Sequence, residues 1–120
     1  MDSTMPELYR HMMEGPSVKS GRCVICGRPY PLEQHHAVWR SWGELYDAEG
    51  NRLPKPLLTV CGAGNNLPYC HGLIHHRMIH LDWRGGEWMW LRTKEPTKLQ
   101  DALEMGGWKR LAVDAAGRSL

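Results

Sequence analysis

The chain reads CGAGNNLPYCHGLIH from Cys61 to His75, and this stretch decides the fold. It places two cysteines on either side of a Gly-rich loop, and two histidines, His71 and His75, four positions apart. Thiolates and imidazoles are the ligands that zinc prefers, and residues four apart on a helix lie on one face. The stretch therefore predicts a metal-binding loop that runs into a helix with both imidazoles on the same side.

A second cysteine pair stands upstream, where residues 23–26 read CVIC. This spacing suits a tight turn around an ion, and Gly27 follows it where the backbone must turn. The two pairs use every cysteine of the chain, which argues against free thiols. We expect one structural Zn²⁺ with no open position for water, held by four thiolates: Cys23, Cys26, Cys61 and Cys70.

The doublet His35-His36 lies in residues 32–39, which are expected to form a strand. Neighbouring side chains on a strand point to opposite sides, so His35 can reach an ion beside His71 and His75 while His36 stays free to take a proton. Phosphodiester hydrolysis needs one group to bind a metal and another to accept a proton, because the metal polarises the phosphate and the base activates water. Imidazole suits the base, since its unperturbed pKa is about 6.5.

Composition limits the chain to a small fold. At 120 residues, with 13 glycines, 8 prolines and no phenylalanine, it is expected to form one domain whose small core a metal helps to stabilise. The six tryptophans are expected to supply much of that core rather than to stack on bases.

The charge is small in total and uneven in distribution. The formal net charge is +2, yet residues 50–81 contain no Asp or Glu. A basic surface around a metal site suits a polyanion such as nucleic acid, and Arg40 and Arg77 are candidate DNA contacts. A solvated face of mixed charge would give the same composition, and charge alone favours that simpler interpretation.

The remaining segments predict an α+β fold in three parts. Residues 1–16 are expected to form an N-terminal accessory helix capped by Thr4, and residues 17–81 the metal-binding core with a returning strand at 57–60 and a helix over 70–81. The C-terminal extension is expected to comprise three elements in residues 82–120: a hairpin over 82–91, a helix over 97–105 capped by Thr97, and a strand after Trp108.

No apolar run reaches the roughly 18 to 20 residues that a membrane span needs, and the first residues lack the apolar stretch of a signal peptide. We therefore expect a cytoplasmic protein with no membrane partner. In that compartment cysteines serve more often as metal ligands than in disulfides.

In combination, three motifs carry a family resemblance: LEQHHAV at residues 32–38, LLTVCG at 57–62 and CHGLIH at 70–75. The segment from Cys23 to His76 resembles the zinc-containing HNH endonucleases, especially small phage-encoded ones. That resemblance implies a ββα-metal (His-Me) finger on a zinc-stabilised treble-clef frame, with flanking helices, that cuts DNA. One departure is Pro56, which stands where the family has an Asn that braces the loop bearing the base.

By resemblance, His36 is the general base, and His35 and His71 bind a catalytic divalent metal (Mg²⁺, Mn²⁺, Ni²⁺ or Zn²⁺). His75 matches either a third ligand or a phosphate contact. The implied role is DNA processing or packaging in the host cytoplasm, beside a terminase or another DNA-processing protein.

Two other hypotheses remain open at this point. The first is a non-catalytic zinc-binding treble-clef module that binds DNA or a protein partner, for which Pro56 would mark a decayed site. The second is a redox function of the cysteines, which predicts no tightly bound zinc. The retained histidines His35, His36 and His71 favour the enzyme, because a pure binding module has no chemical need for them.

Overall fold

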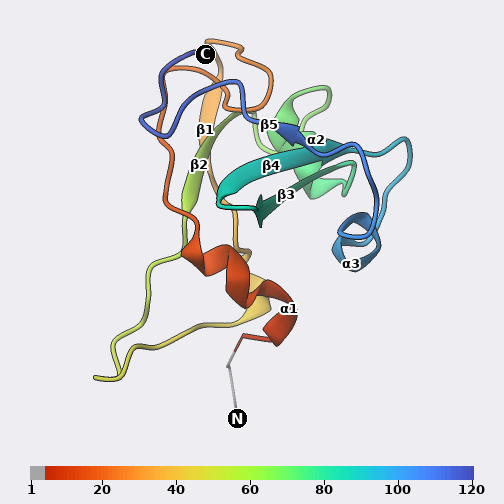
Figure 1. Cartoon of the computed structure of the whole chain (residues 1–120). Helices are drawn as coiled ribbons and strands as arrows, with labels where there is room; N and C mark the ends of the chain where they lie inside the picture. The colour runs from red at the N-terminus through yellow and green to blue at the C-terminus, as the bar shows by residue number, and fades with distance from the viewer. Residues whose placement is uncertain (1–4) are drawn as a thin grey trace.

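The computed structural model describes residues 5–120, so the predicted cap at Thr4 lies outside the described residues. Two small antiparallel sheets and several short helices make up the fold (Figure 1). The elements in chain order are α1 (Glu7–Arg10), η1 (His11–Glu14), β1 (Leu32–His36), η2 (Arg40–Trp42), β2 (Leu57–Cys61), α2 (Cys70–His75), β3 (Ile79–Arg84), β4 (Glu87–Arg92), α3 (Leu99–Ala102) and β5 (Lys109–Arg110). The chain is therefore a small mixed fold of helices and strands, as the sequence predicts.

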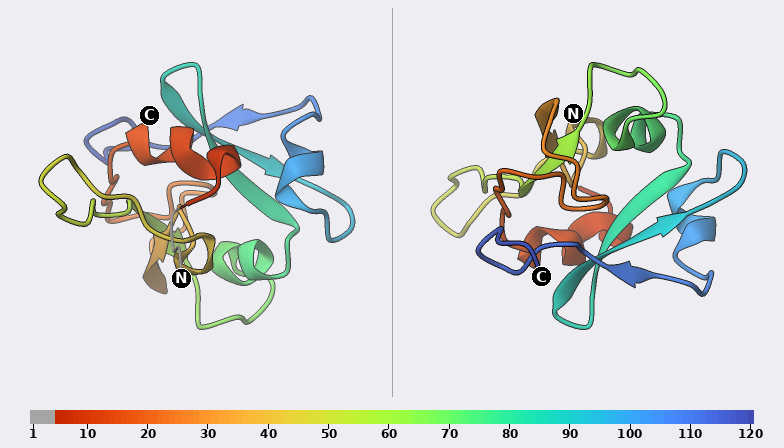
Figure 2. Two further views of the ribbon diagram at one scale, coloured as in Figure 1. Left: turned by 90° about the horizontal axis from the view of Figure 1, so that it is seen from below. Right: turned by 90° about the horizontal axis from the view of Figure 1, so that it is seen from above.

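The first sheet is the hairpin of β1 and β2, whose register pairs Leu32 with Cys61 and His36 with Leu57. Both strands form where the sequence predicts them, although β1 ends at His36 because the chain turns into η2 a few residues later. The Gly-rich loop after β2 leads into α2. Both views in Figure 2 place α2 between this hairpin and the start of β3, and α2 contacts both β2 and β3.

The predicted helix over 70–81 is wrong beyond His75. Arg77 takes a left-handed backbone conformation with φ of 60°, which ends the helix. The chain then continues as β3 in the second sheet, of order β3-β4-β5. The apolar spacing was misleading because Leu81 is buried within a strand, where pairing with β4 outweighs a local preference for helix.

The C-terminal elements differ from their predicted lengths. The hairpin forms around the glycines of residues 85–86, as predicted, but it begins earlier than residue 82. The helix predicted over 97–105 is reduced to α3, because the Thr97 hydroxyl donates to the Glu95 carbonyl and caps no helix. The strand predicted after Trp108 is limited to β5.

The N-terminal segment packs into the core. The predicted N-terminal accessory helix starts at Glu7 and tightens into η1, and the side chains of Met5 and Met12 are fully buried. One hydrophobic cluster includes residues from all three predicted parts of the chain. Strand β3 also runs across the predicted division between residues 81 and 82.

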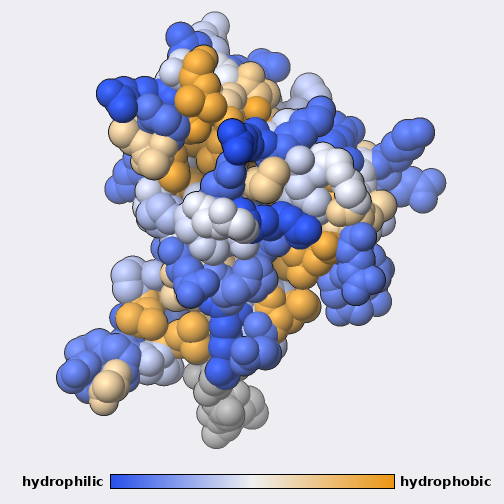
Figure 3. All heavy atoms as spheres, in the orientation of Figure 1, coloured by the Kyte–Doolittle hydropathy of each residue, from blue (hydrophilic) through white to orange (hydrophobic). Residues whose placement is uncertain are grey.

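The centre of the core is mainly aliphatic, and the tryptophans contribute at its edge, where Trp39, Trp42, Trp83 and Trp90 pack partly buried against it. Among the described residues the fully buried side chains include Leu58, Val60 and Val38, whereas Trp88 is the one tryptophan that is buried. On the face shown in Figure 3, hydrophilic residues predominate and apolar ones form separate small groups. Within residues 5–120 no helix has the length and hydropathy to cross a lipid bilayer.

Candidate metal centre

Four cysteines, here called the cysteine cluster, meet where the turn before β1, the end of β2 and the start of α2 come together. Their sulfur atoms lie within 4.8 Å of one another, and the sulfurs of Cys26 and Cys61 are 3.7 Å apart. Zinc–sulfur bonds of about 2.3 Å in a tetrahedron require sulfurs about 3.8 Å apart, whereas a disulfide requires about 2.05 Å. The cluster could therefore hold a structural metal such as zinc: Cys23, Cys26, Cys61 and Cys70.

The chemistry of the four sulfurs also fits a cation. A hydrogen bond from the Cys70 thiol lowers the pKa of Cys23 to about 4, and the same contact raises the pKa of Cys70. Burial raises the pKa of Cys61 to about 11. One thiolate thus forms easily, whereas Cys61 and Cys70 resist ionisation, because the contact with Cys23 and burial disfavour further negative charge. A divalent cation is the usual means of holding four such sulfurs ionised in one place.

Three imidazoles, here called the histidine cluster, converge beside the sulfurs. His35 lies on β1, and His71 and His75 lie one turn apart on α2. The three offer ring nitrogens within 4.8 Å of one another, and the Nε2 atoms of His71 and His75 are 3.1 Å apart. Zinc–nitrogen bonds of about 2.0–2.1 Å require nitrogens about 3.3 Å apart in a tetrahedron, so the arrangement fits a shared divalent ion.

The surroundings of His35 also suit a metal ligand. Its Nε2 atom is buried and has no hydrogen-bond partner, which is rare for a buried polar atom. Burial, followed by the neighbouring His71 and His75, lowers the pKa of His35 to about 3. The ring is therefore neutral at physiological pH, as a metal ligand must be.

Glu33 belongs to the candidate site, although the sequence did not predict it there. Its Oε1 atom lies 2.8 Å from Nδ1 of His71, which leaves Nε2 of that ring to face the cluster. The Gly64 amide donates to the same carboxylate, and a side chain at Gly62 would collide with it. Carboxylates that hold a histidine in this way fix its orientation at metal sites. The available signal was position, since Glu33 precedes His35 by two residues and shares its strand face.

Replacing Glu33 with glutamine is expected to weaken binding of a divalent ion at the histidine cluster by roughly 10-fold to 100-fold. The amide keeps the size of the side chain but loses the charge that orients His71. Calorimetric titration of zinc-loaded protein with Mn²⁺ or Ni²⁺ checks this. Glu49→Gln is the matched control, because Glu49 is exposed and lies outside both clusters. Equal affinities of the two variants would contradict the role given to Glu33.

A cleft of about 360 Å³, here called the histidine cleft, opens over the histidine cluster. His36 lines this cleft with the cluster, although neighbouring side chains on β1 alternate in direction. Burial, followed by Arg40 and Lys55, lowers the pKa of His36, so its neutral form prevails at physiological pH. The lining residues are Gln34, His35, His36, Trp39, Arg40, Ser41, His71 and His75.

Lys55 holds the segment that follows His36, a role for which the local sequence contains no signal. Its ammonium donates to the Trp39 carbonyl at 3.0 Å and lies 3.6 Å from the Glu44 carboxylate. The carbonyl of Pro56 also accepts from the Ala37 amide at 3.0 Å. The segment that follows His36 is thus held by a lysine side chain and by a backbone hydrogen bond.

Replacing Lys55 with methionine is expected to lower the free energy of unfolding by about 1–3 kcal/mol. The substitution keeps the buried stem but leaves the Trp39 carbonyl without its donor and Glu44 without its cation. Urea unfolding followed by tryptophan fluorescence checks the change. The exposed Lys94 provides the control, since Lys94→Met is expected to stay within about 0.5 kcal/mol. A similarly small effect at Lys55 would contradict the bracing role.

The two candidate DNA contacts lie in different places. Arg40 lines the histidine cleft, whereas Arg77 lines a neighbouring cavity. Two further histidines, for which the sequence offers no role, have definite surroundings. His11 lies 2.6 Å from the buried Asp82, and His80 is buried with its Nε2 atom unpartnered. The contact between His11 and Asp82 joins residues far apart in the chain, so no local sequence pattern predicts it.

No protein-family model, curated protein or solved structure matches the chain. The functional interpretation therefore rests on the side chains themselves and on the motif resemblance. Its two observed elements are a cluster of four cysteines and a cluster of three histidines joined at the first turn of α2.

Proposed function

We propose that the protein is a metal-dependent endonuclease of the HNH type that hydrolyses DNA phosphodiester bonds. The observation that carries the proposal is the convergence of His35, His71 and His75 from a hairpin and a helix, with His36 in the same cleft. A binding module would need neither the shared nitrogen geometry nor the additional imidazole beside it.

The histidine cluster and His36 have different roles in the proposed reaction. A divalent cation at the histidine cluster would polarise the scissile phosphate and stabilise charge on the leaving oxygen. His36, neutral at physiological pH, accepts the proton of the attacking water as oxygen bonds to phosphorus. Arg40 at the cleft wall supplies positive charge for the phosphate. The bond from phosphorus to the 3′ oxygen breaks and the leaving oxygen takes up a proton from solvent, giving a 5′ phosphate and a 3′ hydroxyl.

The proposal also assigns the fold around the two clusters. The turn at residues 23–27, the hairpin of β1 and β2, and α2 would form a treble clef closed by zinc on the cysteine cluster, and the hairpin with α2 would be the ββα-metal finger. By motif resemblance, the setting is phage DNA processing or packaging beside a terminase, in the host cytoplasm. These finer assignments depend on the DNA-cleaving activity proposed above.

Supercoiled plasmid provides the test. Zinc-loaded protein is expected to relax or linearise it when Mg²⁺, Mn²⁺, Ni²⁺ or additional Zn²⁺ is supplied in turn. Two adjacent histidines give a matched pair, because His75 belongs to the histidine cluster and the exposed His76 does not. His75→Ala is expected to lose ion affinity and cleavage together, whereas His76→Ala keeps its ion affinity.

The alternative makes the opposite prediction. If no ion gives cleavage above the background of ion-free protein, the endonuclease proposal fails. The non-catalytic zinc module that binds DNA or a protein partner would then account for the chain.

A further inference from the structure

Four cations lie where β3 begins and β4 ends, and they are here called the basic patch: Arg77, Arg92, Lys94 and Lys98. All four are exposed, and none of the ion pairs formed within residues 5–120 includes one of them. Two exposed arginines outside the patch are paired, since Arg110 lies 3.1 Å from Glu87 and Arg118 lies 3.0 Å from Asp114. The basic patch therefore carries positive charge that is available to an anion from outside the chain.

Hydrogen bonds hold the two backbone segments of the basic patch together. The Thr93 amide donates to the Met78 carbonyl at 2.9 Å, and the Thr97 amide donates to the Arg77 carbonyl at 3.0 Å. The hydroxyls of the same two threonines donate to the Glu95 carbonyl at 2.7 and 2.9 Å. Each lysine of the patch directly follows one of these threonines. The loop after β4 is thus a fixed turn that brings its lysines close to Arg77, so its backbone needs no ordering when the patch binds a ligand.

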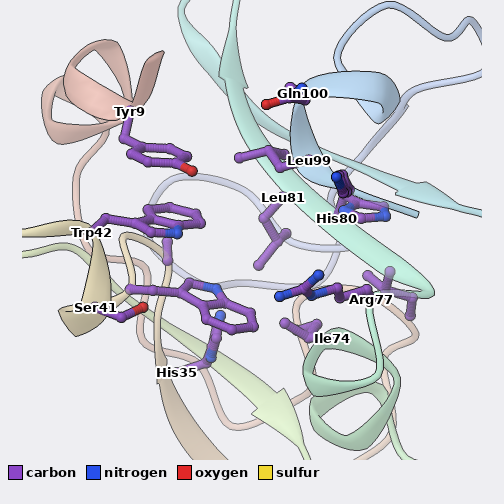
Figure 4. A pocket seen from close by; sticks show the side chains of 14 residues that line it. Tyr9, His35, Ser41, Trp42, Ile74, Arg77, His80, Leu81, Leu99 and Gln100 are labelled. Carbon is purple, nitrogen blue, oxygen red and sulfur yellow. The ribbon is translucent and has the colours of Figure 1, made fainter. Parts of the chain in front are cut away.

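A cavity of about 280 Å³ lies between the basic patch and the histidine cleft (Figure 4). Arg77 and Lys98 line this cavity, and His35, Trp39 and Ser41 line both the cavity and the histidine cleft. Among the described residues that line either of them, none is Asp or Glu. A polyanion that occupies the cleft can therefore continue to the patch without meeting a carboxylate at these walls.

Arg77 takes a backbone conformation that favours glycine. It follows α2 with φ of 60°, and the Met78 amide donates to the Leu73 carbonyl at 2.9 Å across this turn. A residue with a side chain is strained in this conformation, and such strain is concentrated at functional sites. The hydrogen bonds that Arg77 makes with other described residues use its backbone, so the turn does not require a guanidinium. Contact with an anion would account for an arginine at this position.

Glu95 is the one carboxylate in the loop of residues 93–98. It is exposed and forms no ion pair with another described residue. Residues 92–98 still carry three cations against this one carboxylate, a net charge of +2. Glu95 would repel a phosphate held by the neighbouring lysines. Its removal should therefore strengthen the binding of a polyanion to the basic patch.

We propose that the basic patch binds the phosphate backbone of double-stranded DNA beside the segment that lies in the histidine cleft. Unpaired cations on a fixed turn suit phosphates, which are regularly spaced and carry one negative charge each. Such contacts fix the position of the duplex and carry no sequence preference. The inference rests on the proposed function for the identity of the polyanion. It assigns a role to the C-terminal extension, which would hold the DNA while the histidine cluster acts on it.

The salt dependence of DNA binding tests the proposal. Full-length, zinc-loaded His36→Ala protein, with no other divalent ion added, is titrated into a fluorescent DNA duplex, and anisotropy gives the affinity between about 50 and about 200 mM salt. Combining Arg92→Gln with Lys94→Gln is expected to reduce the slope of log affinity against log salt by about 1.8, since each lost phosphate contact removes about 0.9. The matched control combines Arg110→Gln with Arg118→Gln, which removes two paired cations outside the patch and should change the slope little. Equal slopes for the two double variants would overturn the proposal.

Two single variants separate a lost contact from a damaged fold. Arg77→Gly is expected to reduce the slope by about 0.9. Its melting temperature should stay the same or rise, because glycine adopts this φ without strain. Glu95→Gln is expected to tighten DNA binding at the lowest salt concentration, because it removes a negative charge beside the phosphates. Unchanged or weaker binding by Glu95→Gln would overturn the proposal.

The outcomes also separate this inference from the proposed function. Reduced slopes in the patch variants of a protein that cuts no plasmid would support the basic patch and contradict the endonuclease. Plasmid cleavage by a protein whose patch variants keep the full slope would support the endonuclease and overturn the basic patch as a DNA contact.

Discussion

Replacing Cys70 with serine is expected to leave the chain unfolded at room temperature. Cys70 joins the turn before β1 to the first turn of α2 through the cysteine cluster, and the short elements around it bury a small core. Structural zinc in small domains contributes roughly 10–16 kcal/mol of binding free energy, which is comparable with the roughly 5–15 kcal/mol by which whole proteins are stable. Loss of one thiolate removes much of that zinc-binding free energy. Circular dichroism and zinc content per chain provide the measurement.

Ala102→Ser is the matched control for this prediction. Ala102 is fully buried in α3, away from the sulfurs, so the variant also places a hydroxyl inside the protein. It is expected to cost only about 1–3 kcal/mol and to keep its zinc. A folded, cooperatively melting Cys70→Ser protein without bound metal would show that zinc does not stabilise this fold, and would revive a redox interpretation of the cysteines.

Replacing His36 with alanine is expected to lower the single-turnover rate of plasmid cleavage by roughly 100-fold to 10,000-fold, the usual contribution of a general base. His36 lines the histidine cleft but is not one of the three clustered imidazoles. The affinity for the divalent ion should therefore change little. His35→Ala should differ, because it removes a ring nitrogen of the cluster and lowers ion affinity and rate together.

Two measurements on the same protein check the role of His36. Quenched-flow or manual single-turnover assays give the rate at saturating ion, and calorimetry gives the ion affinity. If His36→Ala retains the full rate, the base is another group. If it loses ion affinity as strongly as His35→Ala does, His36 acts as a ligand instead, and the division of labour between the adjacent histidines is wrong.

Local patterns in the sequence predicted the frame well. Cys-x2-Cys spacing predicted a tight turn, and the structure has it, with Gly27 at φ of 82°. Strand signals in residues 32–39 and 57–60 predicted the hairpin of β1 and β2, which forms in antiparallel register. These predictions succeed because the residues that decide the structure are neighbours in sequence, and their preferences agree with the packing around them.

Contacts between distant residues explain what the sequence could not predict. The apolar spacing after His75 favours a helix, but the pairing of β3 with β4 determines the structure there. Nothing before residue 79 encodes that pairing. Glu33 and Lys55 act on His71 and Trp39, which lie far along the chain or across a loop. A charged residue at a strand or loop position has many destinations, so its role becomes visible only when the fold brings its partner close.

The adjacency of Cys70 and His71 at the first turn of α2 has a consequence for anyone who handles the protein. One peptide bond would couple an ion on the sulfurs to the His71 imidazole, so under the proposed function a molecule without zinc is expected to lose the arrangement of the histidine cluster as well. A preparation with partial zinc is then expected to be a mixture of competent and incompetent molecules rather than a uniformly slower protein. Specific activity should scale with zinc stoichiometry in direct proportion, and activity differences between batches would report occupancy instead of catalytic power.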